Sequence, residues 1–365
     1  MTDLKAFIRN QPRTCLLLAL LALAAVALVA ACGDDDDGGG DAATATTAPT
    51  EAAEPTATNE PEPTATTEPE PTATTAPTEK PPAPGYPRVV VDLLGRTVTI
   101  PDKPLAIVAL SPTATELVYA VGGVVIGRSE SVDFPPEAVG LPSIGTAYQP
   151  SFEAILALEP DLIVADSVIH VQPNLFGPLE ELGVPVVFAG AESLDDVLAA
   201  LTVLGEVLDG EDTAADVIAE IEAARTAAQE ALAGLEISAV VLIGDRERNL
   251  YGAKASSYAG DILSALGLTN PADAQPDSGP FPGYTRIAPE KMLQYDPTYI
   301  FTVTPAPPPA PRLSGVLGFF PGFGGLQALE NDRVVELPVQ LFLQAPGPRA
   351  PEAFAAIVAA IVVEP

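Results

Sequence analysis

The chain has 365 residues, a mass of 37.5 kDa and a formal net charge of −32, with a sequence pI near 4.1. This acidity argues against nucleic-acid binding, which needs a basic surface. One histidine excludes a zinc site made of several histidines, and two cysteines exclude a disulfide scaffold or a cysteine-ligated cluster. Hydrophobic residues make up 47% of the chain, enough for a large core.

The first 32 residues have the pattern of a secretory leader. Three basic residues precede an uncharged apolar stretch at 15–31, which Cys32 follows directly. Small residues before a cleavage point are typical of secreted proteins, and a cysteine after them resembles the lipobox of bacterial lipoproteins. We expect a signal peptide at 1–31 and lipidation of Cys32. The alternative is an uncleaved membrane anchor, although this stretch is at the short limit for a span. Both interpretations place the rest of the chain outside the cytoplasm.

Residues 32–88 have the composition of a disordered tether. An acidic run, Asp34–Asp37, is followed by Thr, Ala, Pro and Glu, and the octet EPEPTATT occurs at 60–67 and again at 68–75. Such a segment cannot bury enough apolar surface to offset its ordering entropy. Its prolines favour extended conformations, so we expect a stiffened spacer. An O-glycosylated stalk is the alternative.

From residue 89 onward, strand and helix patterns alternate. The first series predicts a hairpin and short buried strands separated by helices, and the second repeats this alternation. This order is typical of α/β folds with parallel sheets. The expected strands are 89–91, 98–100, 107–110, 162–165, 186–188, 239–243, 299–303 and 334–337. The expected helices follow Ser111-Pro112-Thr113 through Val121 and lie near 152–159, 176–182 and 259–266.

Residues 211–235 predict one long amphipathic helix between the two series. Apolar residues recur there at spacings of three and four, which places them on one helical face. At about 1.5 Å per residue the helix would be roughly 35 Å long. The residues of this stripe are Val217, Ile218, Ile221, Ala224, Ala228, Leu232 and Leu235.

A near-repeat indicates that the two series have similar structures. Residues 151–164 (SFEAILALEPDLIV) and 288–301 (APEKMLQYDPTYIF) each predict a helix with an acidic first turn, stopped by an acid–proline pair and followed by a strand. We therefore expect an α/β fold with two similar Rossmann-like lobes. Each would have a parallel sheet, and the lobes at 89–210 and 236–365 would be joined by the rigid helix at 211–235.

The order of several segments resembles a known family. These are the substrate-binding lipoproteins of ABC importers for ferric siderophores, haem and cobalamin, the class III periplasmic binding proteins with a helical backbone. The resemblance covers nearly all of 89–365 and is specific for the family rather than for the ligand. The segments are VVDLLGRTVTIPDKPLAIVALSPTATELVYAVG, SVDFPPEAVGLPSIGTAYQPSFEAILALEPDLIVA, NLYGAKASSYAGDILSALG, APEKMLQYDP and PGPR.

The resemblance implies a partner and a docking surface. Family members deliver their ligand to an ABC permease dimer with a cytoplasmic ATPase, and one acidic residue from each lobe meets permease arginines. The matching positions here are Glu153 and Glu290. Charge-assisted carboxylate–guanidinium bonds suit such docking because they orient as well as attract. A purely structural role is the alternative, since the helix dipole also favours Glu in a first turn.

The resemblance also implies a ligand cleft between the lobes, at the carboxyl ends of the strands. Aromatic side chains there suit a flat chelate, and arginines suit an anionic one, although each aromatic can equally be an ordinary core or surface residue. The predicted cleft residues are Ser111, Pro112, Thr113, Phe134, Tyr148, Leu250, Tyr251, Tyr284, Phe342, Arg246, Arg248 and Arg286.

Some residues leave alternatives open. Arg128 and Arg349 are further cleft candidates, and Arg349 can instead cap the neighbouring helix. His170 could reach the cleft as a haem ligand, but the pattern favours a solvated loop histidine. The proline-rich stretch Pro305–Pro311 predicts a loop whose role the sequence does not indicate.

The predicted function is that of a binding protein rather than an enzyme. We expect a lipid-anchored monomer outside the cytoplasm that captures a metal chelate, without a cofactor of its own. The order of preference is ferric siderophore, then cobalamin, then haem. One alternative is a sensory or adhesive lipoprotein that uses the same fold. A secreted hydrolase is the other; it would have to use His170, and the body has no G-x-S-x-G motif.

Overall fold

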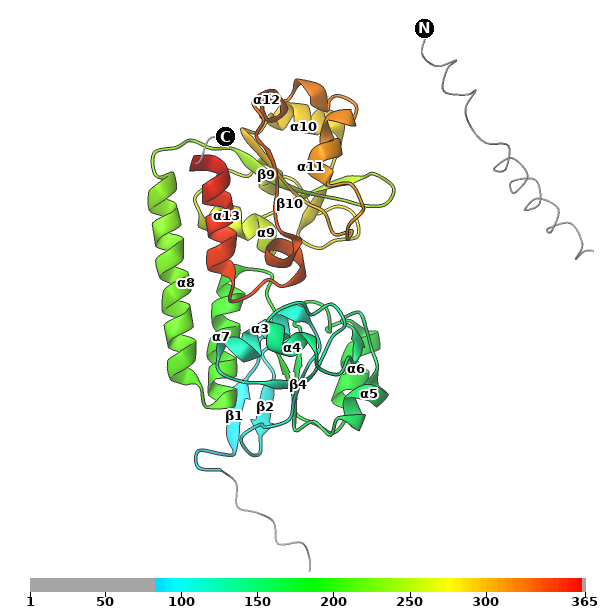
Figure 1. Cartoon of the computed structure of the whole chain (residues 1–365), viewed down its shortest axis with the longest axis vertical. Helices are drawn as coiled ribbons and strands as arrows, with labels where there is room; N and C mark the ends of the chain where they lie inside the picture. Colours follow the sequence, from blue (N-terminus) through cyan, green and yellow to red (C-terminus); the bar gives the residue numbers. More distant parts are fainter. Residues whose placement is uncertain (1–82, 363–365) are drawn as a thin grey trace, which may run out of the picture. The chain divides into compact units, whose positions relative to one another are not determined.

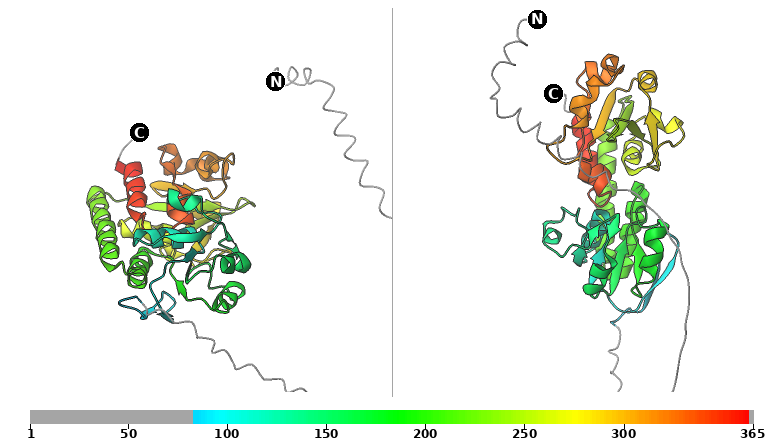
Figure 2. Two further views of the ribbon diagram at one scale, coloured as in Figure 1. Left: turned by 60° about the horizontal axis from the view of Figure 1, so that its bottom comes forward. Right: turned by 90° about the vertical axis from the view of Figure 1, so that its right-hand side faces the viewer.

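The computed structural model describes residues 83–362, all of which belong to one compact unit, Thr75–Pro365. The predicted leader at 1–31, the lipidation site Cys32 and the tether up to residue 82 lie outside the described residues. Within 83–362, two α/β lobes follow one another along the chain and are joined by a long helix (Figure 1). The right-hand view of Figure 2 shows the same division. The predicted fold class is therefore confirmed.

The N-terminal lobe is built on a four-stranded parallel sheet with strand order β4-β3-β7-β8. Strands β3 (Ile107–Ala109), β7 (Leu162–Ala165) and β8 (Val186–Phe188) are entirely buried, as expected for parallel strands covered on both faces. The lobe also contains β1 (Arg88–Val91), β2 (Thr97–Ile100), α3 (Pro112–Ala120), β4 (Val125–Arg128), α4 (Pro136–Val139), β5 (Gly145–Thr146), β6 (Gln149–Pro150), α5 (Phe152–Ala157), α6 (Pro173–Glu180) and α7 (Leu194–Leu208).

The C-terminal lobe has a five-stranded mixed sheet with strand order β11-β10-β9-β12-β13. Strands β9 (Ala239–Gly244), β12 (Tyr299–Val303) and β13 (Val334–Glu336) are parallel, whereas β10 (Leu250–Ala253) is antiparallel to both of its neighbours. The prediction of two parallel sheets is therefore wrong for this lobe. The short turn between β9 and β10 makes a hairpin, because a parallel crossover needs a much longer connection.

The other elements of this lobe complete the second α/β layer. They are α9 (Tyr258–Ala265), a 3₁₀ turn (Pro271–Ala274), β11 (Tyr284–Ile287), α10 (Pro289–Tyr295), α11 (Leu313–Val316), two further 3₁₀ turns (Leu317–Phe319 and Phe323–Gly325), α12 (Gln327–Glu330), a π-helical turn (Gln340–Gln344) and α13 (Ala350–Val362).

The long helix between the lobes is α8 (Glu211–Leu232), three residues shorter than predicted. It ends where Ala233 leaves the helical conformation and Gly234 takes a positive φ of 79°. Leu235 is consequently exposed and does not belong to the apolar stripe. Helix α8 packs against α7 and α13, so the connection between the lobes is a layer of three helices (Figure 1).

The predicted near-repeat is confirmed. In one lobe α5 is followed by β7, and in the other α10 is followed by β12. Each helix has its glutamate in the first turn, Glu153 in α5 and Glu290 in α10. The two segments therefore fold into the same helix–strand unit.

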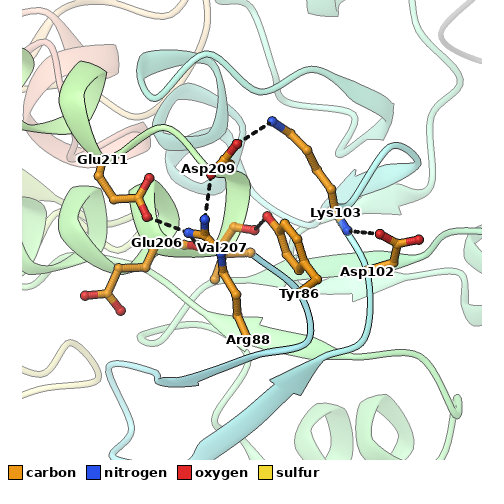
Figure 3. Close-up of polar contacts among 8 residues, drawn as sticks. All are labelled: Tyr86, Arg88, Asp102, Lys103, Glu206, Val207, Asp209 and Glu211. Atoms are coloured by element: carbon orange, nitrogen blue, oxygen red, sulfur yellow. Dashed lines mark hydrogen bonds and ion pairs between the residues drawn. The ribbon is translucent and has the colours of Figure 1, made fainter. Parts of the chain in front are cut away.

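The folded body begins before residue 89. Tyr86 is buried and donates a hydrogen bond from its hydroxyl to the carbonyl oxygen of Val207 at 2.8 Å. Arg88 bonds Asp209 and Glu211 at the α7–α8 corner, and Lys103 also pairs with Asp209 (Figure 3). Residues 83–88, predicted as part of the tether, are thus held against this corner. We call Tyr86, Arg88, Lys103, Asp209 and Glu211 the N-terminal polar cluster.

Candidate functional site

A pocket of about 270 Å³ lies between the two lobes. The N-terminal lobe contributes Asp133 and Phe134, and the C-terminal lobe contributes Pro338, Gln340, Leu341, Arg349 and Glu352. Phe134 is 39% exposed, so its ring is accessible on the pocket wall. Among the predicted aromatic residues, Phe134 lines this pocket between the lobes, and the resemblance implies a ligand cleft between the lobes.

Arg349 closes one side of this inter-lobe pocket. Its guanidinium binds the carboxylate of Glu116 through two bonds, Nε to Oε2 at 2.9 Å and Nη2 to Oε1 at 2.6 Å. The same guanidinium lies over the Phe134 ring, 4.5 Å from the centroid. The Arg349 guanidinium is thus already bound to a buried carboxylate, while the backbone carbonyl of Arg349 accepts hydrogen bonds from Glu352 and Ala353 at the start of α13.

The C-terminal lobe carries a cluster of aromatic rings. Phe281 lies between Tyr251 and Tyr284, with ring centroids 5.2 Å and 6.2 Å away in edge-on arrangements. Both tyrosines are buried, and burial raises the pKa of Tyr284 to about 12. Phe281 is 39% exposed and is the accessible ring of the cluster. The two predicted tyrosines are therefore brought together, but through a phenylalanine that the sequence analysis missed.

The C-terminal lobe also exposes three of the predicted arginines, one of which adjoins the aromatic cluster. Arg246 and Arg248 lie in the β9–β10 turn, and Arg286 lies on β11 directly opposite Tyr251. Arg286 bonds the side-chain oxygen of Asn249. Within residues 83–362, none of the three arginines forms an ion pair.

The predicted cleft loop after β3 is buried. Ser111 caps α3 by accepting a hydrogen bond from the Ala114 backbone N–H at 3.0 Å, and its hydroxyl donates to Asp166 Oδ2 at 3.0 Å. Pro112 and Thr113 are buried as well. These residues support the local fold, and only a change in the surrounding loops would expose them to a ligand.

His170 is completely buried, which corrects the prediction of a solvated loop histidine. Its Nδ1 accepts a hydrogen bond from the Asp166 backbone N–H at 2.8 Å, so the proton is on Nε2, which donates to the Ala147 carbonyl oxygen at 2.9 Å. Burial lowers the pKa of the imidazole. Both nitrogens are occupied, and the ring has no lone pair free for haem iron.

The remaining predicted cleft residues are either buried in the hydrophobic core or located at the surface. Leu250 and Phe342 are almost fully buried in two hydrophobic clusters, so they have no surface for a ligand. Tyr148 is 66% exposed and follows Ala147, whose carbonyl oxygen accepts the hydrogen bond from His170. Arg128 bonds three backbone carbonyls around its own turn and is thereby used locally.

The two predicted docking glutamates are both exposed. Glu153 and Glu290 lie in the first turns of α5 and α10, and neither forms an ion pair among the described residues. Three residues further on, Leu156 and Leu293 are each 45% exposed. The two lobes thus present equivalent surfaces with one carboxylate and one leucine each.

Residues 83–362 contain no group of three or more His, Cys, Asp or Glu that could hold a metal ion. In the same range, no helix is both long and apolar enough to cross a membrane.

Known proteins resemble this chain in sequence and in fold. It is 26% identical over 221 residues to the Fe(3+)-citrate-binding protein YfmC of Bacillus subtilis, a match that covers 59% of this chain and 67% of the relative. It is 39% identical over 103 residues to a vitamin B12-binding protein of Pectobacterium carotovorum, with 27% of this chain and 36% of that protein covered. The chain therefore spans only about a third of the latter's length.

Solved structures extend the fold comparison to nearly whole chains. The petrobactin-binding protein YclQ of Bacillus subtilis superposes with a TM-score of 0.65 at 16% identity, covering 75% of this chain and 98% of that one. The sequence pattern of the family described as "Periplasmic binding protein" matches residues 107–341, which include most of both lobes and all of α8. The chain belongs to the periplasmic binding protein family.

Proposed function

We propose that this protein is the extracytoplasmic substrate-binding protein of an ABC importer and that it captures a metal chelate. A ferric siderophore is the preferred ligand, followed by cobalamin and haem. The proposal depends most on one observation: Arg286 lies opposite Tyr251 of the aromatic cluster, and neither it nor Arg246 and Arg248 of the β9–β10 turn forms an ion pair among the described residues. In a chain with 17 basic and 49 acidic residues, arginines without an ion-pair partner in the same lobe as an aromatic cluster favour an anionic, partly flat ligand.

The printed names of the relatives support this ligand class. They include an Fe(3+)-citrate-binding protein, vitamin B12-binding proteins and a petrobactin-binding protein. The bonding of His170 makes haem the least favoured of the three, because an axial ligand needs a free imidazole nitrogen.

We further propose that the loaded protein docks on a permease dimer through Glu153 and Glu290, and that Cys32 carries the lipid that holds the protein at the membrane. The matched exposure of the two glutamates supports a partner with two-fold symmetry, because each lobe would meet one half of it. Capture and delivery require no cofactor of the protein's own, and we expect a monomer.

A hydrolase is not favoured. A serine nucleophile needs a histidine base within hydrogen-bond reach. Ser111 and His170 both contact Asp166, but the hydroxyl of Ser111 bonds the carboxylate, whereas His170 bonds only backbone groups. A sensory or adhesive role is the other alternative. A protein with that role would have the same fold but would not bind a chelate for an importer.

Ligand binding by the compact unit, residues 75–365, tests the proposal. Ferric catecholate and hydroxamate siderophores, cobalamin, cobinamide and haemin are added separately, and thermal unfolding is followed with an external dye because the chain has no tryptophan. A ligand at about 100 times its Kd should stabilise the fold by about 2.7 kcal/mol.

The triple variant Arg246→Gln/Arg248→Gln/Arg286→Gln should lose this response to anionic chelates. The control is Arg312→Gln, an exposed arginine of the same lobe that bonds only a local carbonyl. A folded protein that responds to nothing in the panel would contradict the proposal and favour the sensory or adhesive role. A triple variant that responds like the wild type would contradict the assignment of the arginines alone.

A further inference from the structure

Three direct polar links join the two lobes within residues 83–362. Gln344 Nε2 donates to the Ser131 carbonyl oxygen at 2.6 Å, and the Leu194 backbone N–H donates to Asp261 Oδ2 at 2.7 Å. The third link, between Glu116 of α3 and Arg349 beside α13, differs from these because both partners are charged side chains. We call it the inter-lobe ion pair.

The inter-lobe ion pair is buried and directional. The Glu116 side chain is almost completely inaccessible, and the Arg349 side chain is 16% exposed. Two nearly parallel bonds hold the guanidinium and carboxylate planes together although the residues are 233 positions apart in the chain. A bidentate pair restricts orientation far more than a single bond or an apolar contact does.

Stability alone does not account for this arrangement. The desolvation of two buried charges opposes their attraction, so an apolar pair of similar size can be equally stable. Here burial raises the pKa of Glu116 although Arg349 opposes the shift, and the carboxylates of Asp133 and Glu352 add to it. What an apolar pair cannot provide is direction, because hydrophobic contacts are non-directional.

The residues around the inter-lobe ion pair connect it to the inter-lobe pocket. One hydrophobic cluster includes residues from both lobes, among them Leu117 of α3 and Phe354 of α13, so apolar packing already joins the lobes. Arg349 also lies against the Phe134 ring and lines the inter-lobe pocket. A change in the ion pair would therefore alter both the lobe orientation and the pocket wall.

We propose that the inter-lobe ion pair sets the relative orientation of the two lobes and positions Phe134 at the wall of the pocket between them. Glu116 and Arg349 act as positioning residues and need not contact the ligand. The proposal is independent of which ligand binds and of whether the protein serves an importer.

Distance measurements between two spin labels test the first part. Ala157 of α5 and Gln294 of α10 are exposed and occupy equivalent places in the repeat, so Ala157→Cys and Gln294→Cys put one label on each lobe. The experiment uses the full chain in detergent with Cys15→Ser and Cys32→Ser, which removes the only native thiols. Chemical denaturation of the same samples reports their stability.

The informative variant is Glu116→Met/Arg349→Met, which replaces the ion pair by an apolar pair. We expect its denaturation midpoint to stay close to that of the wild type while the distance distribution becomes about twofold wider, because several lobe orientations become populated. Gln344→Met removes a neutral inter-lobe bond and should leave the width unchanged. An unchanged width in the stable double variant would overturn the proposal.

A second variant keeps the test decisive if the double variant does not fold. Arg349→Lys retains the positive charge but loses the planar fork, so it should also widen the distribution. If Arg349→Lys has the wild-type width, the directional bond is not needed and the proposal fails.

Fluorescence tests the second part. The chain has no tryptophan, so Phe134→Trp introduces a single reporter at the pocket wall. Adding Glu116→Met/Arg349→Met should shift the tryptophan emission to longer wavelength, because the indole ring loses its contact with Arg349 and becomes more exposed to solvent. Identical emission spectra with and without the ion pair would show that Arg349 does not position residue 134.

Discussion

Gly279 lies where a side chain would collide with the ring of Tyr251. A Cβ atom built on Gly279 would be 2.5 Å from Tyr251 Cε1, and the residue has a positive φ of 100°. Both features require glycine, the first through contact and the second through backbone conformation. The close approach of this loop to Tyr251 therefore helps to shape the aromatic cluster.

We expect Gly279→Ala to destabilise the protein by more than the roughly 1 kcal/mol typical of a strained glycine position. The matched control is Gly267→Ala, which also has a positive φ, of 78°, but no atom within 4 Å of the added Cβ. Urea denaturation compares the two. Equal losses would show that the contact with Tyr251 relaxes at no cost.

The buried carboxyl of Glu116 predicts that the free energy of unfolding depends on pH. Its pKa is raised by burial, with Arg349 opposing and Asp133 and Glu352 adding to the shift. The folded state therefore keeps the proton to a higher pH than the unfolded state does, and its stability falls as the pH rises from the ordinary glutamate pKa through the raised value.

Glu116→Gln should remove this dependence. We expect the unfolding free energy of the wild type, relative to the variant, to decrease as the pH rises through that window. Denaturation series at several pH values measure it. The opposite slope would mean that the attraction of Arg349 exceeds the effect of burial.

At the scale of elements, the N-terminal polar cluster holds the first described residues, from 83 onward, against the folded body. Arg88 and Lys103 both bind Asp209 (Figure 3). The Ala83 backbone N–H donates to the side chain of Asp102. Hydrogen bonds from Lys103 and Arg88 lower the pKa of Asp209. Strand β1 is thereby attached to the corner where α8 starts.

Trypsin can test this attachment, because Arg88 precedes Val89 within β1. We expect Asp209→Asn/Glu211→Gln to accelerate cleavage after Arg88, since the arginine loses both carboxylate partners. Mass spectrometry detects the product that begins at Val89. Asp212→Asn is the control, because this exposed neighbour has no contact with Arg88. Equal cleavage rates in all three proteins would contradict the role of the cluster.

For the whole molecule, the matched helices α5 and α10 predict how the protein meets its partner. We expect Glu153→Ala/Glu290→Ala to abolish uptake in the protein's own cells, because both lobes lose their charged contact. Ligand affinity should change by no more than about 0.5 kcal/mol, as for other surface substitutions. Uptake of labelled ligand and titration of the purified protein give the two values.

A control for this experiment removes two exposed glutamates elsewhere. Glu181→Ala/Glu330→Ala takes one from each lobe outside α5 and α10 and should leave uptake intact. Loss of affinity in the Glu153/Glu290 variant would show that these residues act on the ligand rather than on docking.

The three-helix connection predicts a small lobe closure on ligand binding. Helix α8, which packs against α7 and α13, resists bending more than two or three loop strands would, and the inter-lobe ion pair adds a directional restraint. We expect a rotation of a few degrees. X-ray scattering with and without ligand measures the change, and a large compaction would contradict the prediction.

The sequence alone determined the features that depend on local pattern. The buried strands β3, β7 and β8 are short apolar runs, and α8 follows from an apolar stripe at helical spacing, so periodicity was enough to predict them. The repeat around Glu153 and Glu290 was visible as matched residues, and with it the two-lobed fold.

Only the tertiary structure decided what depends on contacts between distant residues. The partner of Arg349 lies 233 residues away, and nothing near Glu116 in the chain indicates it. His170 resembled a loop histidine because its burial depends on a carbonyl 23 residues earlier. Phe281 was missed because its place between Tyr251 and Tyr284 comes from the folding of its loop. Local propensity acts over a few residues, whereas burial and ion pairing depend on which surfaces meet after the chain has folded.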